Sequence, residues 1–158
     1  MGIERLRFAP IDMHLHRDQA LSFREDSFYC SFGDTSGFHR DEYIAVLEAR
    51  LARDPWSAVH AWLGERIVGQ MEFGQFKPDP SIGYINLYYL IPEQRGQGIA
   101  GQLDAHATDH LTRRGHRRAH LSVSPSNTRA LRYYARHGWT QVGPRPEAPN
   151  VVLMHKTL

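Results

Sequence analysis

The chain has 158 residues, of which 41% are hydrophobic and 23% are charged, as expected for a globular domain of common size. This composition argues against wholesale disorder and fibrous repeats, and the only cysteine, Cys30, excludes an internal disulfide and a zinc site built from several cysteines. The formal net charge of +2 is too small to call for a nucleic acid as partner, and it equally suits the binding of an anionic small molecule.

The location expected from the sequence is the cytoplasm, with no membrane partner. No apolar run approaches the roughly 20 residues that a membrane-spanning helix needs. Residues 1–10 also lack the apolar stretch of a signal peptide. No internal repeat or low-complexity linker interrupts the chain, so one domain over residues 1–158 is expected.

The first third of the chain is predicted to hold a short strand and two helical segments. Residues 5–9 form the strand, and residues 12–32 are expected to be helical in part. In residues 41–53 the hydrophobic positions recur at spacings of three and four, which predicts an amphipathic helix that ends at Asp54-Pro55.

The middle of the chain is predicted to form three consecutive strands. Residues 57–63 and 66–76 form a hairpin around the turn Gly64-Glu65. Residues 82–91 are rich in isoleucine, tyrosine and leucine and contain no charged residue. Such a composition is typical of a strand that is buried on both faces.

The last third of the chain is predicted to alternate between helices and strands. The expected elements are a helix over 99–111, a strand over 119–123, a helix over 127–137 capped by Asn127, and strands over 139–142 and 151–155, separated by a proline-rich turn over 144–149. Strands dominate the middle and helices interrupt them later. The order therefore indicates an α/β or α+β fold and excludes a helical bundle.

A glycine-rich turn, Arg95-Gly96-Gln97-Gly98-Ile99-Ala100, lies between the uncharged strand and the next helix. Two glycines and an alanine let the backbone approach a ligand, and the first N–H groups of a helix lack internal partners and carry its positive dipole end. Such a turn can bind phosphate or pyrophosphate, and Arg95 adds a donor fork suited to phosphate oxygens. The turn is neither a P-loop nor a full dinucleotide fingerprint, and by itself it also fits a simple helix entry.

Two segments together resemble the GNAT acetyltransferase superfamily. Residues 90–100 are similar to the family's R/Q-x-x-G-x-G/A acetyl-CoA motif. Residues 127–139 are similar to its N-x-x-A-x-x-x-Y-x-R/K-x-G-F/W motif, in which the fixed positions are filled by Asn127, Ala130, Tyr134, Arg136, Gly138 and Trp139. The resemblance is strong over residues 82–143 and loose over residues 1–55.

The resemblance implies a fold and a division of the chain. The fold is a mixed, mostly antiparallel sheet of six or seven strands, flanked by about four helices. The two central strands, which end at Ile91 and Val123, lie parallel and splay apart. Residues 1–55 would form the acceptor side of one acyltransferase domain, and residues 56–158 would form the sheet core and the acetyl-CoA site.

The resemblance also implies acetyl-CoA as cosubstrate and no metal. The pantetheine arm would pair with the backbone edge of Tyr89, Leu90 and Ile91, where the Leu90 N–H would polarise the thioester carbonyl. Asn127 would hydrogen-bond the same arm. The pyrophosphate would lie on the N–H groups of the turn, contributed by Arg95, Gly96, Gln97, Gly98, Ile99 and Ala100.

The implied reaction is the direct attack of a primary amine, of a small molecule or a peptide, on the thioester. Tyr134 occupies the family's general-acid position, and a phenol with a pKa of about 10 can donate a proton at neutral pH. The alternative is that Tyr134 is only a half-buried aromatic of its helix, as expected for its neighbour Tyr133. The base stays open between Glu72, His120 and water, because Ser122 stands where some relatives carry a glutamate.

Several further interpretations compete with this one. A catalytically silent CoA-binding sensor or interaction module is the main alternative, and transfer to a hydroxyl or of a longer acyl chain is another. His106 and His110 have ligand-like spacing, but no third ligand is evident. The aromatic segment 27–33 belongs either to the core or to the acceptor pocket. The acceptor's identity and the choice between monomer and homodimer stay open.

Three arginines of the last predicted helix have two interpretations. Arg129, Arg132 and Arg136 either contact the 3′-phosphate or adenine end of CoA or form a solvated face. The basic run over 113–118 is expected to lie at the far end of its helix from the pyrophosphate, and a nucleic-acid partner is not expected.

Overall fold

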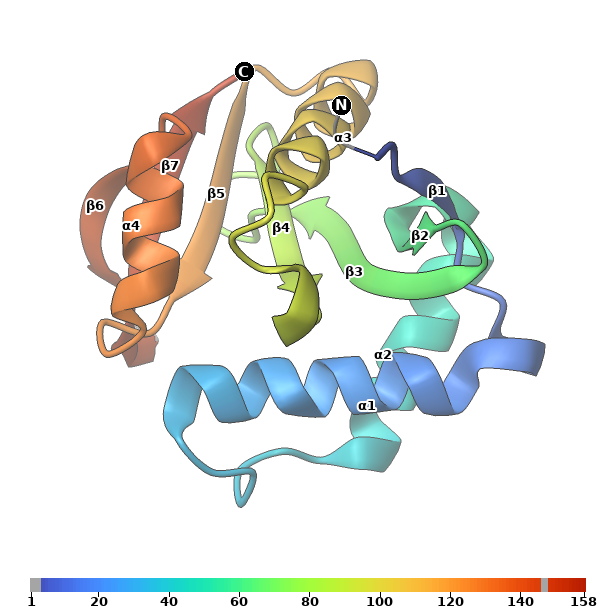
Figure 1. Cartoon of the computed structure of the whole chain (residues 1–158). Coiled ribbons are helices and arrows are strands. Elements are labelled where there is room, and N and C mark those ends of the chain that lie inside the picture. Colours follow the sequence, from blue (N-terminus) through green and yellow to red (C-terminus); the bar gives the residue numbers. More distant parts are fainter. Residues whose placement is uncertain (1–3, 146–147) are drawn as a thin grey trace.

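The computed structural model describes residues 4–145 and 148–158, which form a seven-stranded sheet and four α-helices (Figure 1). The helices are α1 (Met13–Phe32), α2 (Arg40–Arg53), α3 (Ala100–Arg113) and α4 (Thr128–Arg136). The strands are β1 (Arg7–Pro10), β2 (Ala58–Leu63), β3 (Arg66–Gln75), β4 (Gly83–Leu90), β5 (Arg118–Val123), β6 (Thr140–Arg145) and β7 (Ala148–Thr157). None of the described helices is long and apolar enough to cross a membrane.

The strand order is β1-β2-β3-β4-β5-β7-β6, and all neighbours are antiparallel except β4 and β5. The predicted mixed, mostly antiparallel sheet is therefore confirmed. The parallel pair is paired only from Gly83 opposite Ala119 to Ile85 opposite Leu121. Beyond Ile85 the two strands diverge, so the expected splay of the central strands is confirmed as well (Figure 1).

The helix α1 covers nearly the whole of residues 12–32, which the sequence predicted to be helical only in part. It begins at Asp12, whose carboxylate accepts hydrogen bonds from the N–H groups of His14 at 2.9 Å and Leu15 at 3.1 Å. Such a cap satisfies N–H groups that have no partner within the helix. The helix ends at Gly33, which adopts the left-handed conformation with φ of 81°. One residue inside it, His16, departs from helical geometry.

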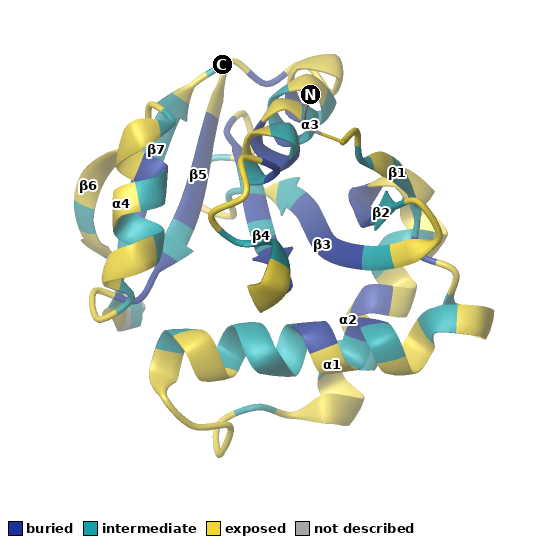
Figure 2. Cartoon of the chain, in the orientation of Figure 1, coloured by how far each residue is buried: buried dark blue, intermediate teal, exposed yellow. Residues whose placement is uncertain are grey.

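The helices cover opposite faces of the sheet. On one face, Glu72 of β3 reaches Tyr43 and Arg50 of α2. On the other face, the neighbouring Phe73 stacks on His110 of α3 with 4.5 Å between ring centres. Figure 2 shows the buried residues gathered on β3, β4 and β5, between these two layers. A second, smaller cluster of buried side chains lies under α1 and α2 and consists of Ile11, Ala20, Leu47 and Ala58.

One residue of β4, Asn86, interrupts the alternation of the strand. Glu72 lies opposite Leu87, whereas the next residue, Phe73, lies opposite Ile85, so Asn86 is an extra residue that forms a bulge. After the bulge, odd-numbered residues such as Leu87 face α1 and α2. Before it, odd-numbered residues such as Ile85 share the α3 face with Phe73.

The structure corrects two details of the predicted strands. The strand over 82–91 is not buried on both faces throughout, because Tyr84, Asn86 and Tyr88 are only partly buried where β4 leaves β5. The predicted turn over 144–149 is shorter than expected, since β6 continues to Arg145. Pro144 fits there because β6 is an edge strand, where a missing N–H removes no hydrogen bond from the sheet. Residues 146–147 of that turn lie outside the described residues.

Candidate functional site

A cavity of about 370 Å³ lies where β4 and β5 diverge. Its walls come from the second half of β4, the end of β5, the C-terminal half of α1, the start of α3 and the inner face of α4. Of the eleven predicted site residues, seven line it: Tyr89, Leu90, Arg95, Gly96, Ala100, Asn127 and Tyr134. The two sequence motifs therefore meet at one place in the fold.

The other four predicted site residues do not line the cavity. Ile91 and Ile99 are buried in the main hydrophobic core, where they are 6% and 5% exposed. Gln97 and Gly98 are exposed on the turn before α3. Contact of these four residues with a ligand, through backbone N–H groups, stays a prediction.

The backbone of Leu90 faces the divergence of the strands. The Ile91 N–H donates to the Val68 carbonyl of β3 at 2.8 Å, so Ile91 points toward β3. Consecutive residues of a strand present their polar groups to opposite edges, and Leu90, opposite Gly69, therefore points away from β3. Its carbonyl already accepts a hydrogen bond from Arg95 Nε at 2.8 Å, which leaves its N–H as the group that a ligand could use.

The side chain of Arg95 packs against the end of β4 and against α1. Its guanidinium lies 5.5 Å from the centre of the Tyr89 ring and 3.9 Å from the Asp26 carboxylate, which also accepts a hydrogen bond from the Tyr89 hydroxyl. The sequence predicted this side chain as a phosphate donor. In the structure it holds the strand end to α1, and a contact with phosphate stays a prediction.

The turn before α3 exposes backbone rather than side chains. Gly96 and Gly98 have φ of 75° and 81°, a conformation that other residues rarely adopt. No described side chain caps the N-terminus of α3 at Ile99, so its first N–H groups point outward. Two hydroxyls fix this end of the helix, because Tyr133 donates to the Ala100 carbonyl at 2.7 Å and the Tyr88 hydroxyl hydrogen-bonds that of Tyr133 and lies 3.2 Å from the same carbonyl. Tyr133 therefore has the packing role expected for it.

The ring of Tyr134 is 8% exposed and packs edge-on against Tyr88 and Trp139. Its hydroxyl makes no hydrogen bond with a described residue, although the side chain lines the cavity. Burial, followed by the neighbouring Tyr133 and Asp104, raises the pKa of Tyr134 above its usual value. The phenol is therefore protonated throughout the neutral range and able to donate.

Asn127 begins α4 as predicted. Its Oδ1 accepts a hydrogen bond from the Ala130 N–H at 3.2 Å, which caps the helix. The amide still has two N–H donors, and the residue lines the cavity. One side chain can thus cap the helix with its oxygen and offer its nitrogen to a ligand.

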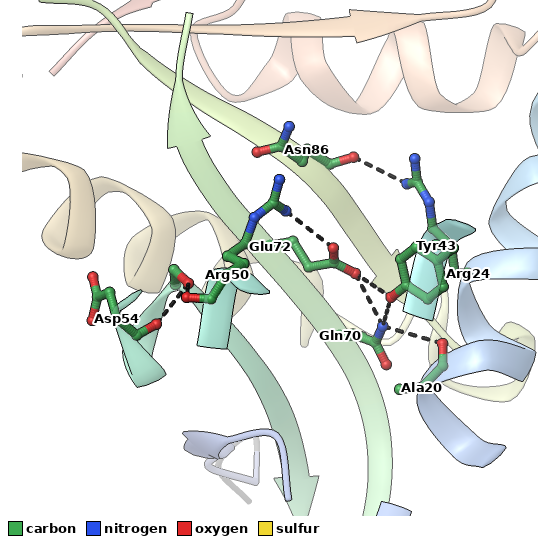
Figure 3. A network of polar contacts seen from close by, with 9 residues as sticks. Ala20, Arg24, Tyr43, Arg50, Asp54, Gln70, Glu72 and Asn86 are labelled. Carbon is green, nitrogen blue, oxygen red and sulfur yellow. Dashed lines mark hydrogen bonds and ion pairs between the residues drawn. The ribbon is translucent and has the colours of Figure 1, made fainter. Parts of the chain in front are cut away.

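Neither side chain proposed as a base lines the cavity. Glu72 is 2% exposed and accepts hydrogen bonds from Tyr43 at 2.5 Å, Arg50 at 3.1 Å and Gln70 at 3.2 Å (Figure 3). Two of these donors, Tyr43 and Arg50, tie the carboxylate of β3 to α2. Of the three alternatives for the base, water is the one compatible with these positions, because neither Glu72 nor His120 lines the cavity.

His120 is also turned away from the cavity. Its Nε2 lies 3.2 Å from Nδ1 of His155 on β7, and its ring packs against Phe76. Burial, followed by the nearby His155, lowers the pKa of His120. These contacts give it a place in the packing between β5 and β7.

The wall of the cavity formed by α1 carries residues of the segment 27–33, whose role the sequence left open between the core and the acceptor pocket. Arg24, Ser27, Phe28, Ser31 and Phe32 line this wall. This placement supports the acceptor-pocket interpretation of residues 27–33. Phe23 of the same helix belongs to the core, at 6% exposure.

A polar cluster of Tyr84, Ser122 and Arg145 adjoins the cavity, and the sequence did not predict it. The hydroxyl of Tyr84 donates to Ser122 Oγ at 2.6 Å, and both lie on the cavity wall. Arg145 donates from Nη1 to Tyr84 Oη at 3.1 Å and to Ser122 Oγ at 3.0 Å. Ser122, which stands where some relatives carry a glutamate, was the only indication of this cluster in the sequence. No motif near Arg145 indicated that it lies beside the site.

The histidines with ligand-like spacing have packing roles. His106 stacks on Phe8 with 4.0 Å between ring centres, and His110 stacks on Phe73. Burial lowers the pKa of both, that of His110 to about 4. Within residues 4–145 and 148–158, no three or more His, Cys, Asp or Glu side chains come together as potential metal ligands.

Comparisons with known proteins point to one family. The family model described as acetyltransferase (GNAT) family matches residues 17–139. No curated protein sequence matches the chain. Among solved structures, an acetyltransferase from Thermus thermophilus is similar with a TM-score of 0.76 and 21% identity, over 100% of both chains.

Two similar structures were solved with a ligand. YncA from Salmonella typhimurium, with its cofactor acetyl-CoA, has a TM-score of 0.75 and 16% identity, over 98% of this chain and 94% of that one. The PaiA N-acetyltransferase from Thermoplasma acidophilum, in complex with coenzyme A, has a TM-score of 0.70 and 14% identity, over 98% and 99%. At such identities the likeness shows the fold alone.

Proposed function

Since the chain belongs to the acetyltransferase (GNAT) family, we propose that it is an acetyl-CoA-dependent N-acetyltransferase acting on a primary amine of a small molecule or peptide. The observation that carries the proposal is the cavity between β4 and β5, which brings Leu90, the start of α3, Asn127 and Tyr134 together. The presence of CoA or acetyl-CoA in two proteins of similar fold supports the same cosubstrate here.

The residues present fit acetyl-CoA in two respects. The outward N–H groups at the uncapped start of α3, after the exposed glycines, suit a pyrophosphate. The edge of β4 beyond Ile85 has lost its pairing with β5, so its backbone can pair with the amides of a pantetheine arm. Arg129 of α4 lines the same cavity, which supports its predicted contact with the phosphate-bearing end of CoA, whereas Arg132 and Arg136 do not line it.

The proposed mechanism has one step in which the amine nitrogen forms a bond to the acetyl carbon and the carbon–sulfur bond breaks. The Leu90 N–H hydrogen-bonds the thioester oxygen and stabilises the negative charge that develops there. Tyr134 donates its hydroxyl proton to the departing thiolate. Water takes the proton that the amine loses, because no described residue lining the cavity is an aspartate, glutamate or histidine.

The two halves of the site are proposed to divide the substrates between them. The α3 and α4 walls hold acetyl-CoA, and the α1 wall receives the acceptor. This division matches the expected roles of residues 1–55 and 56–158. It places the amine beside the divergence of β4 and β5, where the thioester would lie.

Release of the CoA thiol from acetyl-CoA, measured against a panel of primary amines, tests the proposal. We expect amine-dependent release and an N-acetyl product of the corresponding mass. The lack of a side-chain base on the described wall also suits a CoA-binding sensor without turnover. Thermal stabilisation by CoA with no release for any amine would favour the sensor and overturn the transferase.

A further inference from the structure

We propose that the acceptor carries a carboxylate that Arg24 binds, so that the substrate class is amino acids and related amino-carboxylates. This inference rests on the proposed N-acetyltransferase function and narrows its acceptor. Arg24 lies on α1 and lines the cavity, and it is partly buried. Its Nη1 donates to the Asn86 carbonyl at 3.0 Å, and its guanidinium lies 5.8 Å from the centre of the Tyr43 ring (Figure 3).

Arg24 differs from the charged residues beside it because it has no carboxylate partner. Glu25 lies 3.7 Å from Arg40, and Asp26 lies 3.9 Å from Arg95. Arg24 itself makes no ion pair with any residue in the described part of the chain. A partly buried cation without a counter-charge has lost hydration without gaining an ionic contact, and an anionic ligand would supply that contact.

The guanidinium has donors to spare. An arginine has five N–H groups in a rigid fork, and the contact with the Asn86 carbonyl uses one of them. The remaining donors match the two oxygens of a carboxylate, which arginine binds with paired hydrogen bonds. The contact with Asn86 fixes the guanidinium against β4, so the fork is held in place before a ligand arrives.

The location of Arg24 assigns it to the acceptor rather than to CoA. Its partner Asn86 forms the bulge where β4 leaves β5. The start of α3, where the pyrophosphate is proposed, lies on the opposite face of the sheet from α1. An acceptor whose carboxylate rests on Arg24 would therefore have its amine near the divergence, beside the proposed position of the thioester.

The charges around the cavity favour an anionic acceptor over a cationic one. Of the three arginines that line it, Arg95 is paired with Asp26 and Arg129 is proposed to contact CoA, so Arg24 is the cation left for the acceptor. None of the described lining residues is acidic. A polyamine would find no counter-charge on this wall. Phe28 and Phe32 add an apolar surface, which suits the side chain of an amino acid.

Matched acceptor pairs test the proposal. Thiol release from acetyl-CoA is measured with leucine, leucinamide and isopentylamine, and with phenylalanine, phenylalaninamide and phenethylamine; spermidine is a cationic control. The amides have a lower amine pKa than the acids, so at equal pH more of each amide is the neutral nucleophile. We expect the acid of at least one pair to have a kcat/KM about 10- to 100-fold above its amide, against this intrinsic trend.

Variants of Arg24 test its role directly. Arg24→Gln should raise KM for the acid about 10- to 100-fold, leave KM for acetyl-CoA within twofold and remove the preference over the amide. Arg24→Lys should restore part of the preference because it keeps the charge. Arg40→Gln removes a positive charge on α2, outside the cavity wall, and should keep the wild-type preference. Melting temperatures confirm that each variant is folded.

The outcomes separate this inference from the function beneath it. Amides or simple amines acetylated as well as the acids, or an unchanged preference in folded Arg24→Gln, would overturn the carboxylate proposal while leaving the transferase intact. No acetylation of any amine, despite binding of acetyl-CoA, would overturn both.

Discussion

Tyr43 of α2 donates its hydroxyl proton to the carboxylate of Glu72 on β3 at 2.5 Å, inside a polar network between the sheet and the first two helices (Figure 3). Burial, followed by the charge of Glu72, raises the pKa of Tyr43, so the phenol stays a donor. Arg50 supplies the positive charge that balances the carboxylate. The arrangement anchors α2 and, through Arg24 above the Tyr43 ring, one wall of the cavity.

Removing the charge of Glu72 should destabilise the fold. Glu72→Gln leaves Arg50 without its carboxylate in a buried setting, and we expect a loss of about 3 kcal/mol in the free energy of unfolding, measured with urea. The control is Glu48→Gln, which breaks the exposed pair with Arg17 and should cost less than about 1 kcal/mol. Equal losses for the two variants would contradict a structural role for the buried pair.

The same network predicts that stability falls in mild acid. His60 is 1% exposed and hydrogen-bonds Gln70 at 2.7 Å, and burial lowers its pKa to about 4. An unfolded histidine takes up a proton near pH 6.5, whereas the folded one does not until about pH 4. The stability present above pH 6.5 is therefore lost as the pH falls toward 4, by about 3 kcal/mol.

Urea unfolding at several pH values measures this dependence. The variant His60→Gln should show a smaller loss of stability between pH 7 and about pH 4.5 than the wild type. His14→Gln, at an exposed position of α1, is the control and should keep the wild-type slope. A slope that does not change in His60→Gln would show that other groups control the acid response.

Loss of the Tyr134 hydroxyl should affect chemistry more than binding. Tyr134→Phe keeps the ring packing against Tyr88 and Trp139, and we expect kcat and kcat/KM to fall together by about 100-fold while acetyl-CoA affinity is unchanged. Because burial raises the pKa of Tyr134, its ionisation should not limit kcat below pH 10.

Tyr133→Phe is the matched control for that variant. It removes the hydrogen bond to the Ala100 carbonyl, so we expect a loss of about 1 kcal/mol in stability but a much smaller effect on kcat. If Tyr134→Phe turns over like the wild type while chemistry is rate-limiting, solvent rather than Tyr134 protonates the thiolate.

Two variants of Gly98 that differ in charge but hardly in shape test whether the turn before α3 binds the pyrophosphate. Gly98 has φ of 81°, so any side chain there introduces strain, and Asn and Asp are among the residues that adopt that conformation most often. We expect acetyl-CoA to raise the melting temperature of Gly98→Asn but to raise that of Gly98→Asp far less, because a carboxylate would repel the pyrophosphate. Equal shifts in the two variants would place the pyrophosphate elsewhere.

The two proposed roles of Asn127 are separable. Asn127→Ala should lose about 1 kcal/mol of stability with the cap and should also bind acetyl-CoA more weakly. Asn127→Ser keeps a capping oxygen but lacks the longer amide, so its stability should be close to wild type while its affinity falls. Calorimetric titration with acetyl-CoA measures the affinity, and wild-type affinity in Asn127→Ser would reduce the residue to a helix cap.

Much of the fold could be predicted because its signals are local. The hairpin around Gly64, the amphipathic helix after Ile99 and the cap at Asn127 each depend on neighbouring residues. The contacts of Arg24 with Asn86 could not be predicted in this way, since 62 positions separate the two residues. The interpretation of Glu72 as a base failed for the same reason, because its donors Tyr43 and Arg50 lie on another element.

The bulge at Asn86 turns the odd-numbered residues at the two ends of β4 toward different layers of helices. Before the bulge, Ile85 faces the interior beneath α3. After the bulge, Leu87 faces the layer of α1 and α2. Deleting Asn86 would leave the composition of the strand almost unchanged. It would, however, exchange the two faces of the sheet toward which the side chains in the first half of β4 point. Tyr84 would then enter the apolar layer beneath α3, and its hydroxyl would lose its hydrogen bond to Ser122 and its place on the cavity wall.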